Sequence, residues 1–154
     1  MLGQLASWQT VTKLFWFTTC LVWKKTLEST ILDIVTNGMK IAILDTSAEC
    51  HMPDTLSMPY RPDIRDADIP YKKEFTYKLS GNTCLAGDII GDYSFDKELK
   101  IGDKIILEDM IHYTMVKTTT FNGVNLPSIA IKRKTGNIEI VRNYDYLSYK
   151  DRLS

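Results

Sequence analysis

The sequence has no surplus of charge, because its 19 Lys and Arg residues are matched by 19 Asp and Glu residues. Proteins that bind nucleic acids normally carry a basic excess, since phosphate contacts supply much of their affinity. Glycine and proline are also scarce, with 8 and 5 residues among 154, which excludes a collagen-like or low-complexity chain. The composition therefore indicates one folded domain, or one domain and an arm, and disfavours nucleic-acid binding.

Cysteine is equally sparse, with only Cys20, Cys50 and Cys84 in the chain and no C-x-x-C spacing among them. An odd, scattered set of this kind excludes a disulfide framework and favours a reducing compartment. The segment 49–54 (ECHMPD) brings one Cys and one His close to two carboxylates, which invites interpretation as a metal site. A zinc site would still lack a fourth strong ligand, so we predict no metal here.

Long apolar runs are absent too. The most apolar stretch, residues 14–23, has about half of the roughly 20 residues that a membrane-spanning helix needs. No small-residue cleavage site follows it, and Lys24 and Lys25 come soon after. We therefore predict no membrane segment and a cytoplasmic protein, with residues 14–23 as a buried strand or a surface that faces a partner.

The remaining pattern is one of short β-branched runs. Residues 31–35 and 39–44 flank Asn37-Gly38, which predicts a hairpin with a type I′ turn, because both turn residues accept positive φ. Residues 46–71 contain four prolines and predict a long irregular connection. Further runs predict strands at 75–79 and 104–107, a hairpin at 128–132 and 138–141, and a short helix at 144–153. Together they predict a mostly β domain, either a barrel or a sandwich.

Two clusters carry side chains suited to chemistry. Cys84 follows a turn and precedes Leu85-Ala86-Gly87-Asp88, so its thiol is either exposed and reactive or a small buried hydrophobe, and free cysteines are more often the latter. Residues 109–123 contain a carboxylate, an imidazole, a phenol and several hydroxyls. Neutral hydroxyl donors suit a phosphate or carboxylate ligand, but the same residues also fit a core boundary with ordinary β-propensity.

The two clusters together, in this order and with the segments upstream, resemble the carboxynorspermidine decarboxylase family. That family belongs to the alanine-racemase-like, pyridoxal-phosphate-dependent decarboxylases, which also include ornithine and diaminopimelate decarboxylases. The resemblance covers about Trp23 to Ile131 and is carried by the segments 32–35, 37–39, 45–54, 58–62, 84–95, 102–103, 109–117 and 121–124.

The resemblance implies a domain organisation. Such enzymes join a (β/α)8 barrel, which bears the lysine that binds pyridoxal 5'-phosphate, to a C-terminal β-barrel domain, and they act as homodimers with shared active sites. Residues 23–154 are expected to be that C-terminal β-barrel of a fold-type III decarboxylase, with the (β/α)8 barrel absent. Residues 1–22 match nothing in the family. Where the family has a Glu-Pro-Gly motif, the sequence has Trp16-Phe17-Thr18.

The resemblance also implies roles for individual residues. Cys84 is expected to be the catalytic proton donor in the partner's active site, and Asp88 to bind a cationic amine of the substrate there. Tyr113 is expected to hydrogen-bond the cofactor phosphate, whereas His112 and Asn122 are expected to give structural support.

The substrate implied by the resemblance is a polyamine. Diaminopimelate decarboxylases usually place Glu directly after the cysteine, and the apolar Leu85 argues against that branch. An aliphatic carboxynorspermidine or carboxyspermidine fits better, with further amines reaching Asp54 or Glu49. No lysine here stands in the context of the cofactor lysine, so the chain alone is expected to be inactive. The alternative is a non-catalytic remnant or interaction module that pairs with a separate barrel domain.

Overall fold

The structure is a computed structural model that describes residues 25–111 and 113–153. The predictions for residues 1–22, for the apolar stretch 14–23 and for His112 therefore lie outside the described residues. Within the described ranges, no helix is both long enough and apolar enough to cross a membrane.

A β-hairpin forms the centre of the main sheet. Strands β1 (Leu27–Asn37) and β2 (Met39–Leu44) pair antiparallel, as predicted. The prediction of a type I′ turn is wrong, however, because Asn37 pairs directly with Met39. Of the two residues predicted to form the turn, only Gly38 has a positive φ, of 72°. Glycine adopts that conformation without steric cost, so a single residue is enough to reverse the chain.

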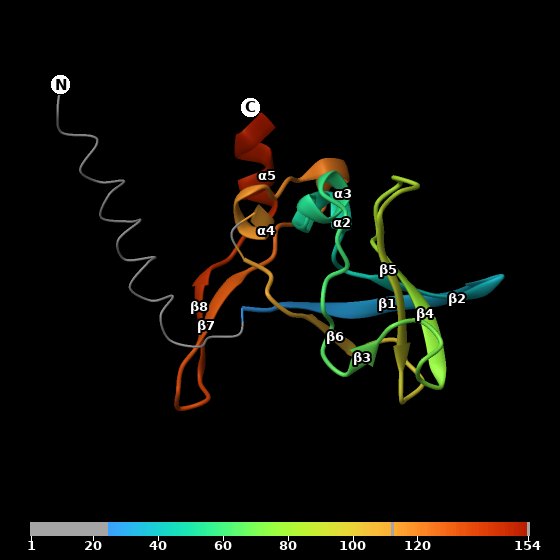
Figure 1. The fold of residues 1–154 in the computed structure, drawn as a ribbon. Helices are drawn as coiled ribbons and strands as arrows, with labels where there is room; N and C mark the ends of the chain where they lie inside the picture. The colour runs from blue at the N-terminus through green and yellow to red at the C-terminus, as the bar shows by residue number, and fades with distance from the viewer. Residues whose placement is uncertain (1–24, 112, 154) are drawn as a thin grey trace, which may run out of the picture.

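Four more strands complete this sheet: β3 (Ala67–Asp68), β4 (Phe75–Ser80), β5 (Ile89–Phe95) and β6 (Lys104–Leu107). The strand order is β3-β5-β4-β2-β1-β6 (Figure 1), in which β2 and β4 run parallel and the other neighbours antiparallel. The predicted strands at 75–79 and 104–107 are confirmed. Strand β5 was not predicted from the sequence.

The sheet curls so that its two edges approach each other. Ile64, just before the edge strand β3, forms an isolated antiparallel bridge with Leu107 of the other edge strand, β6. The amide of Arg65 also donates to the carbonyl of Ile106 at 2.9 Å. These contacts satisfy backbone groups that an open edge would leave exposed. The mostly β, barrel-type fold predicted from the sequence is confirmed.

The core lies inside this curl, where alternate side chains of the strands point inward. Tyr77 and Phe95 meet edge to face with 6.2 Å between ring centroids. Each fully buried aliphatic side chain contributes about 2 kcal/mol to folding. The buried hydrophobic cluster comprises Ile31, Ala42, Leu44, Ala48, Met52, Ile64, Tyr77, Leu79, Ile90, Tyr93, Phe95, Ile105, Leu107 and Met110.

Short helices gather at one end of the sheet (Figure 1). The Pro-rich connection 46–71 is not wholly irregular, because it contains the single-turn helices α2 (Ala48–His51) and α3 (Asp54–Ser57). The helix α4 (Tyr113–Val116) and the 3-10 turn η1 (Phe121–Gly123) lie near them.

A second, two-stranded sheet stands beside the main one (Figure 1). Its strands β7 (Ile129–Lys132) and β8 (Ile138–Arg142) pair antiparallel and confirm the predicted hairpin. Gly136 has φ of 89° in its turn. The chain then forms helix α5 (Tyr146–Leu153), which confirms the short helix predicted near the C-terminus.

Candidate functional site

Cys84 lies on the exposed loop 81–88 that connects β4 to β5. The reading of this thiol as a small buried hydrophobe is wrong, because its side chain is open to solvent. The amide nitrogen of Asn122, in η1, donates a hydrogen bond to its sulfur over 3.1 Å. An exposed thiol with a polar partner is accessible for chemistry in a way that a packed thiol is not.

Asp88 ends the same loop, but its carboxylate points into the domain and is only 1% exposed. One oxygen accepts the backbone amide of Ala48 at 2.6 Å and that of Glu49 at 3.3 Å. The other accepts the amide of Thr83 at 3.2 Å and its hydroxyl at 2.6 Å. Asp88 therefore joins the residue before Cys84 to the first turn of α2, and this placement does not support contact with a substrate amine.

Helix α2 also reaches the segment that presents Asn122. The side chain of Ser47 caps α2 by accepting the amide of Cys50 at 3.0 Å. The Cys50 thiol donates to the carbonyl of Phe121 at 3.4 Å, and the Cys50 carbonyl accepts the amide of Thr119 at 2.8 Å. Residues 119–123 are thus fixed to α2, so α2 connects both sides of the Cys84–Asn122 contact.

His51, the last residue of α2, is buried with protein partners on both ring nitrogens. Nδ1 accepts the amide of Ser47 at 3.2 Å and lies 2.8 Å from the Thr46 hydroxyl, whereas Nε2 lies 3.0 Å from the carbonyl of Asn125. A carbonyl accepts only, so Nε2 carries the proton and the ring is neutral. Burial lowers the pKa of His51, against the opposing effects of the Asn125 carbonyl, Asp88 and Asp45.

The potential metal-ligand side chains of the segment 49–54 do not converge on a common point. Across the described ranges, no three His, Cys, Asp or Glu side chains form a group that could hold a metal ion. Asp54 is buried, with one oxygen accepting the Tyr60 hydroxyl at 2.9 Å. Burial, and then this bond to Asp54, raises the pKa of Tyr60 to about 12. Neither Asp54 nor the partly buried Glu49 is as open as Cys84.

Tyr113 opens helix α4 and is 55% exposed. The ammonium of Lys117, one turn later, lies 5.1 Å from the centroid of its ring. Interpretation of Tyr113 as a core-boundary residue is therefore wrong, and its phenol is accessible. Cys84 contacts Asn122, Asp88 contacts Ala48 and Tyr113 contacts Lys117, so these three predicted site residues have separate partners within the described part of the chain.

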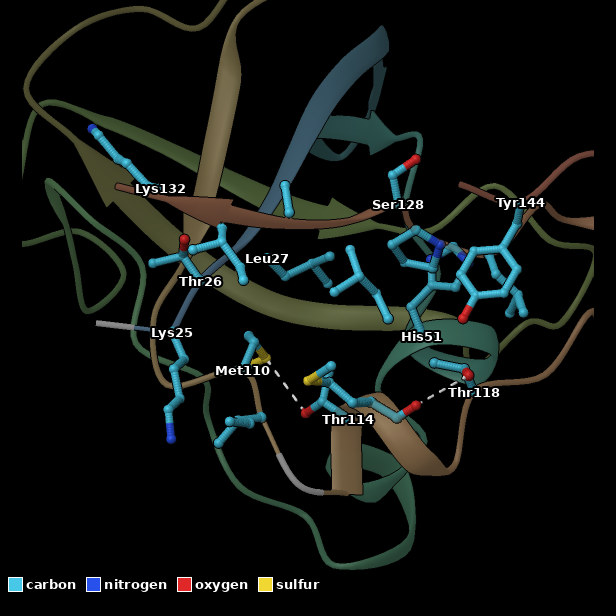
Figure 2. Close-up of a pocket in the computed structure, with 17 residues that line it drawn as sticks. Lys25, Thr26, Leu27, His51, Met110, Thr114, Thr118, Ser128, Lys132 and Tyr144 are labelled. Carbon is cyan, nitrogen blue, oxygen red and sulfur yellow. Dashed lines mark hydrogen bonds between the residues drawn. The ribbon is translucent and has the colours of Figure 1, made fainter. Parts of the chain in front are cut away.

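A cavity of about 330 Å³ lies between α4, α2 and β7 (Figure 2). His51 and Tyr144 face each other at one end of it, and Met110 and Thr114 lie at its floor, joined by a hydroxyl-to-sulfur contact of 3.9 Å. Its lining is mainly apolar, with Lys25 and Lys132 among its residues. Cys84, Asp88 and Tyr113 do not line it, so the cavity is separate from the predicted catalytic residues.

Residues 18–111 match the family described as "Pyridoxal-dependent decarboxylase, C-terminal sheet domain". This chain belongs to that family. The resemblance inferred from the residue motifs is thereby confirmed, and the curled sheet is the decarboxylase sheet domain. The match covers the whole six-stranded sheet and ends before β7 and β8.

Relatives of this sheet domain are considerably longer than the chain. It is 51% identical to a carboxyaminopropylagmatine decarboxylase from Synechocystis over 82% of this chain and 33% of that protein. It is 47% identical to a carboxynorspermidine/carboxyspermidine decarboxylase from Campylobacter jejuni over 80% of this chain and 35% of that protein. The chain thus spans about a third of the length of the curated relatives it matches.

A solved structure shows the same fold. A carboxynorspermidine decarboxylase from Campylobacter jejuni, complexed with norspermidine, matches with a TM-score of 0.79 and 46% identity. The match covers 82% of this chain and 38% of that one. The fold and family of the sheet domain are therefore settled together.

The bond between Asn122 and Cys84 was missed by sequence reasoning, which treated Asn122 as structural support. The two residues are 38 positions apart, and no local sequence pattern predicts their contact. One signal was present: Asn122-Gly123 is a pair suited to left-handed backbone, and both residues adopt it, with φ of 58° and 72°.

Proposed function

We propose that this sheet domain is the C-terminal part of a pyridoxal-phosphate-dependent decarboxylase that acts on a carboxylated polyamine. The observation that carries the proposal is the 42–51% identity to relatives whose names describe that activity, together with an exposed Cys84. Loss of CO2 from carboxynorspermidine or carboxyspermidine would give norspermidine or spermidine, in polyamine biosynthesis.

The substrate class is narrowed by the residue beside the thiol. Leu85, next to Cys84, is 39% exposed and offers an apolar surface. A glutamate at this position would instead bind a charged end of the substrate. Binding of a long aliphatic amine is favoured when its methylene groups cover such a surface and exclude water from it. The Synechocystis relative is named for a carboxylated agmatine derivative, so the proposed class includes that compound alongside the two carboxylated polyamines.

Among the described residues, we assign the contact with the cofactor to the phenol of Tyr113. Tyr113 is exposed and can donate a hydrogen bond to a phosphate oxygen without bringing a second charge, so it fits the phosphate of pyridoxal phosphate. When bound, that group stabilises the carbanion left after CO2 departs. The cavity described above is not lined by Tyr113, so we infer that the remaining groups that bind the cofactor come from another domain or subunit.

Cys84 would complete the reaction by protonation. Its Sγ holds a proton, delivers it to the carbon that lost CO2, and is left as a thiolate that solvent reprotonates. General acids within hydrogen-bond reach typically contribute 10²–10⁴-fold, roughly. Residues 84–87 of this loop are exposed, which supports a site shared with a partner subunit in a homodimer.

For Asp88 we propose a role that differs from the substrate contact implied by family resemblance. Its buried carboxylate holds the Cys84 loop against α2, so we assign it to positioning the thiol. The amine groups of the substrate would then be read by residues outside this domain or by its exposed carboxylates.

The proposal is tested by mixing this chain with the separately expressed (β/α)8 domain of the Campylobacter relative and pyridoxal phosphate. We expect CO2 release from carboxynorspermidine that needs both polypeptides, and much slower release from diaminopimelate. Stable association without any CO2 release would favour the non-catalytic interaction module. Equal rates on both substrates would contradict the assigned substrate class.

A further inference from the structure

We propose that Asn122 is a positioning residue for the Cys84 thiol, and that its amide N–H sets both the direction and the reactivity of the sulfur. This inference rests on the proposed role of Cys84 as proton donor. The observation behind it is the 3.1 Å contact from the Asn122 side-chain nitrogen to Cys84 Sγ. A thiol on an exposed loop otherwise has free rotation about its side-chain bonds.

The backbone at Asn122 is arranged for this contact. Its φ of 58° is uncommon for a residue with a side chain, and Asn is one of the few that tolerate it. The side chain is exposed, so the contact gains little from burial. A left-handed Asn rather than Gly at this position is explained by a function for its amide group.

The Asn122 side of the contact is held by helix α2. Cys50 binds the segment at two points, through its thiol to the Phe121 carbonyl and through its carbonyl to the Thr119 amide. His51 binds it at a third point, the carbonyl of Asn125. All three anchors come from two adjacent buried residues, so the amide is presented from a rigid base.

The Cys84 side is held by the same helix. Asp88 accepts two hydrogen bonds from Thr83, directly before the cysteine, and two from the first turn of α2. Bonds to a buried carboxylate are stronger than bonds between neutral groups. A closed path of contacts therefore runs from Cys84 through Asp88 and α2 to Asn122 and back to the sulfur.

The chemical effect follows from which partner donates. An N–H directed at sulfur stabilises the thiolate that remains after the proton leaves, and so favours proton transfer. A carboxylate in its place would have the opposite effect, because it repels the developing negative charge. Asn122→Asp is nearly isosteric and Asp also tolerates left-handed φ, so this change inverts the electrostatics with little change in shape.

The test measures alkylation of Cys84 by iodoacetamide as a function of pH, on the full 154-residue chain, with mass spectrometry to assign the modified residue. We expect Asn122→Asp to move the midpoint of the pH–rate profile up by about one pH unit and to slow alkylation about tenfold at pH 7.5. Asn82→Asp is the matched control: residue 82 is exposed and two positions from Cys84, so it adds the same charge and keeps the Asn122 contact. It should change the rate less than about twofold.

Coincident profiles for Asn122→Asp and the parent chain, or equal shifts for Asn122→Asp and Asn82→Asp, would overturn the proposal. If circular dichroism shows that Asn122→Asp does not fold, Asn122→Gly replaces it, because glycine keeps the backbone and removes the donor. It should shift the midpoint upward by a smaller amount, and an unshifted profile would contradict the proposal. The alkylation assay does not depend on catalytic turnover. Its result therefore tests the role of Asn122 even if the proposed decarboxylase activity is not found.

Discussion

The Asp88 carboxylate accepts the hydroxyl of Thr83 at 2.6 Å, and Thr83 is the residue directly before the exposed Cys84. The same carboxylate accepts the amide of Ala48, which lies 40 positions away at the start of α2. The buried Asp88 carboxylate thus fixes the position of the loop that carries the exposed Cys84 thiol.

Removing the charge of Asp88 should destabilise the domain. In Asp88→Asn, one oxygen becomes an NH2 group that cannot accept hydrogen bonds, so buried donors lose their partner. We expect a loss of about 3 kcal/mol in the free energy of unfolding, measured with urea. The control is Asp96→Asn: the side chain of Asp96 is 72% exposed and pairs with Lys73 on the surface. This change should lower the free energy of unfolding by less than about 1 kcal/mol. Equal costs for the two variants would contradict a structural role for Asp88.

Gly81 should tolerate no side chain. A Cβ added there would collide with the carboxylate of Asp88, whereas one added at Gly87, on the same loop, would meet open space. We expect Gly81→Ala to lower the unfolding free energy by about 2 kcal/mol. Gly87→Ala should stay within about 0.5 kcal/mol of the parent chain. A tolerated Gly81→Ala would show that the loop is not packed against Asp88 as described.

The cysteines at 50 and 84 should differ sharply in reactivity. Cys84 is exposed, whereas Cys50 is 0% exposed and its thiol donates to the carbonyl of Phe121. In the native chain we expect iodoacetamide to modify Cys84 at least about 100-fold faster than Cys50, because Cys50 must wait for local unfolding. Peptide mapping measures both rates, and urea should remove the difference. Comparable native rates would contradict the burial of α2.

Stability should fall as the pH falls through the range where free histidine titrates. Burial lowers the pKa of His51 below the ordinary value of 6.5, so in acid the unfolded chain binds a proton that the folded chain does not. The stabilisation is present above pH 6.5 and is progressively lost below it. We expect the urea midpoint to drop between pH 7.5 and 5.5, and to drop less in His51→Gln. His112→Gln changes the second histidine and should leave the effect of His51 in place.

Several features of the fold could be predicted from short-range pattern alone. Strand β4 alternates inward and outward residues, and the hairpins β1–β2 and β7–β8 have Gly38 and Gly136 where the chain reverses. Strand β5 was missed because Gly91 and Asp92 interrupt its alternation. Its pairing explains both residues: Gly91 takes φ of 147° beside the ring of Tyr93, and Asp92 forms an ion pair with Lys78 on the neighbouring strand.

The site was only partly predictable, because its contacts are long-range. The exposed Cys84 lies on a loop whose Asp88 carboxylate accepts backbone amides of Ala48 and Glu49, which follow β2 and are about 40 positions away in the sequence. Family resemblance predicted a catalytic role for Cys84 on this loop and assigned Asp88 to the substrate. Burial and hydrogen bonding, which no local pattern encodes, identify that side chain as part of the support for the thiol.

Tyr113 offers a test of the proposed cofactor contact. Tyr113→Phe removes one exposed hydroxyl, so we expect no change in the unfolding free energy of this domain beyond about 0.5 kcal/mol. In the complex with a barrel domain, the apparent affinity for pyridoxal phosphate should fall about 5- to 10-fold. Tyr71→Phe alters another exposed tyrosine, 81% exposed, and should leave that affinity unchanged. Equal affinities for the two variants would remove Tyr113 from the cofactor site.

We propose that Cys84 donates a proton in an active site completed by a second domain. The most direct measurement is the rate of norspermidine formation from carboxynorspermidine by this chain combined with the barrel domain of the Campylobacter relative, with and without Cys84→Ala. We expect the variant to bind the barrel domain and pyridoxal phosphate normally and to form norspermidine at least about 100-fold more slowly. Unchanged norspermidine formation by Cys84→Ala would contradict the account.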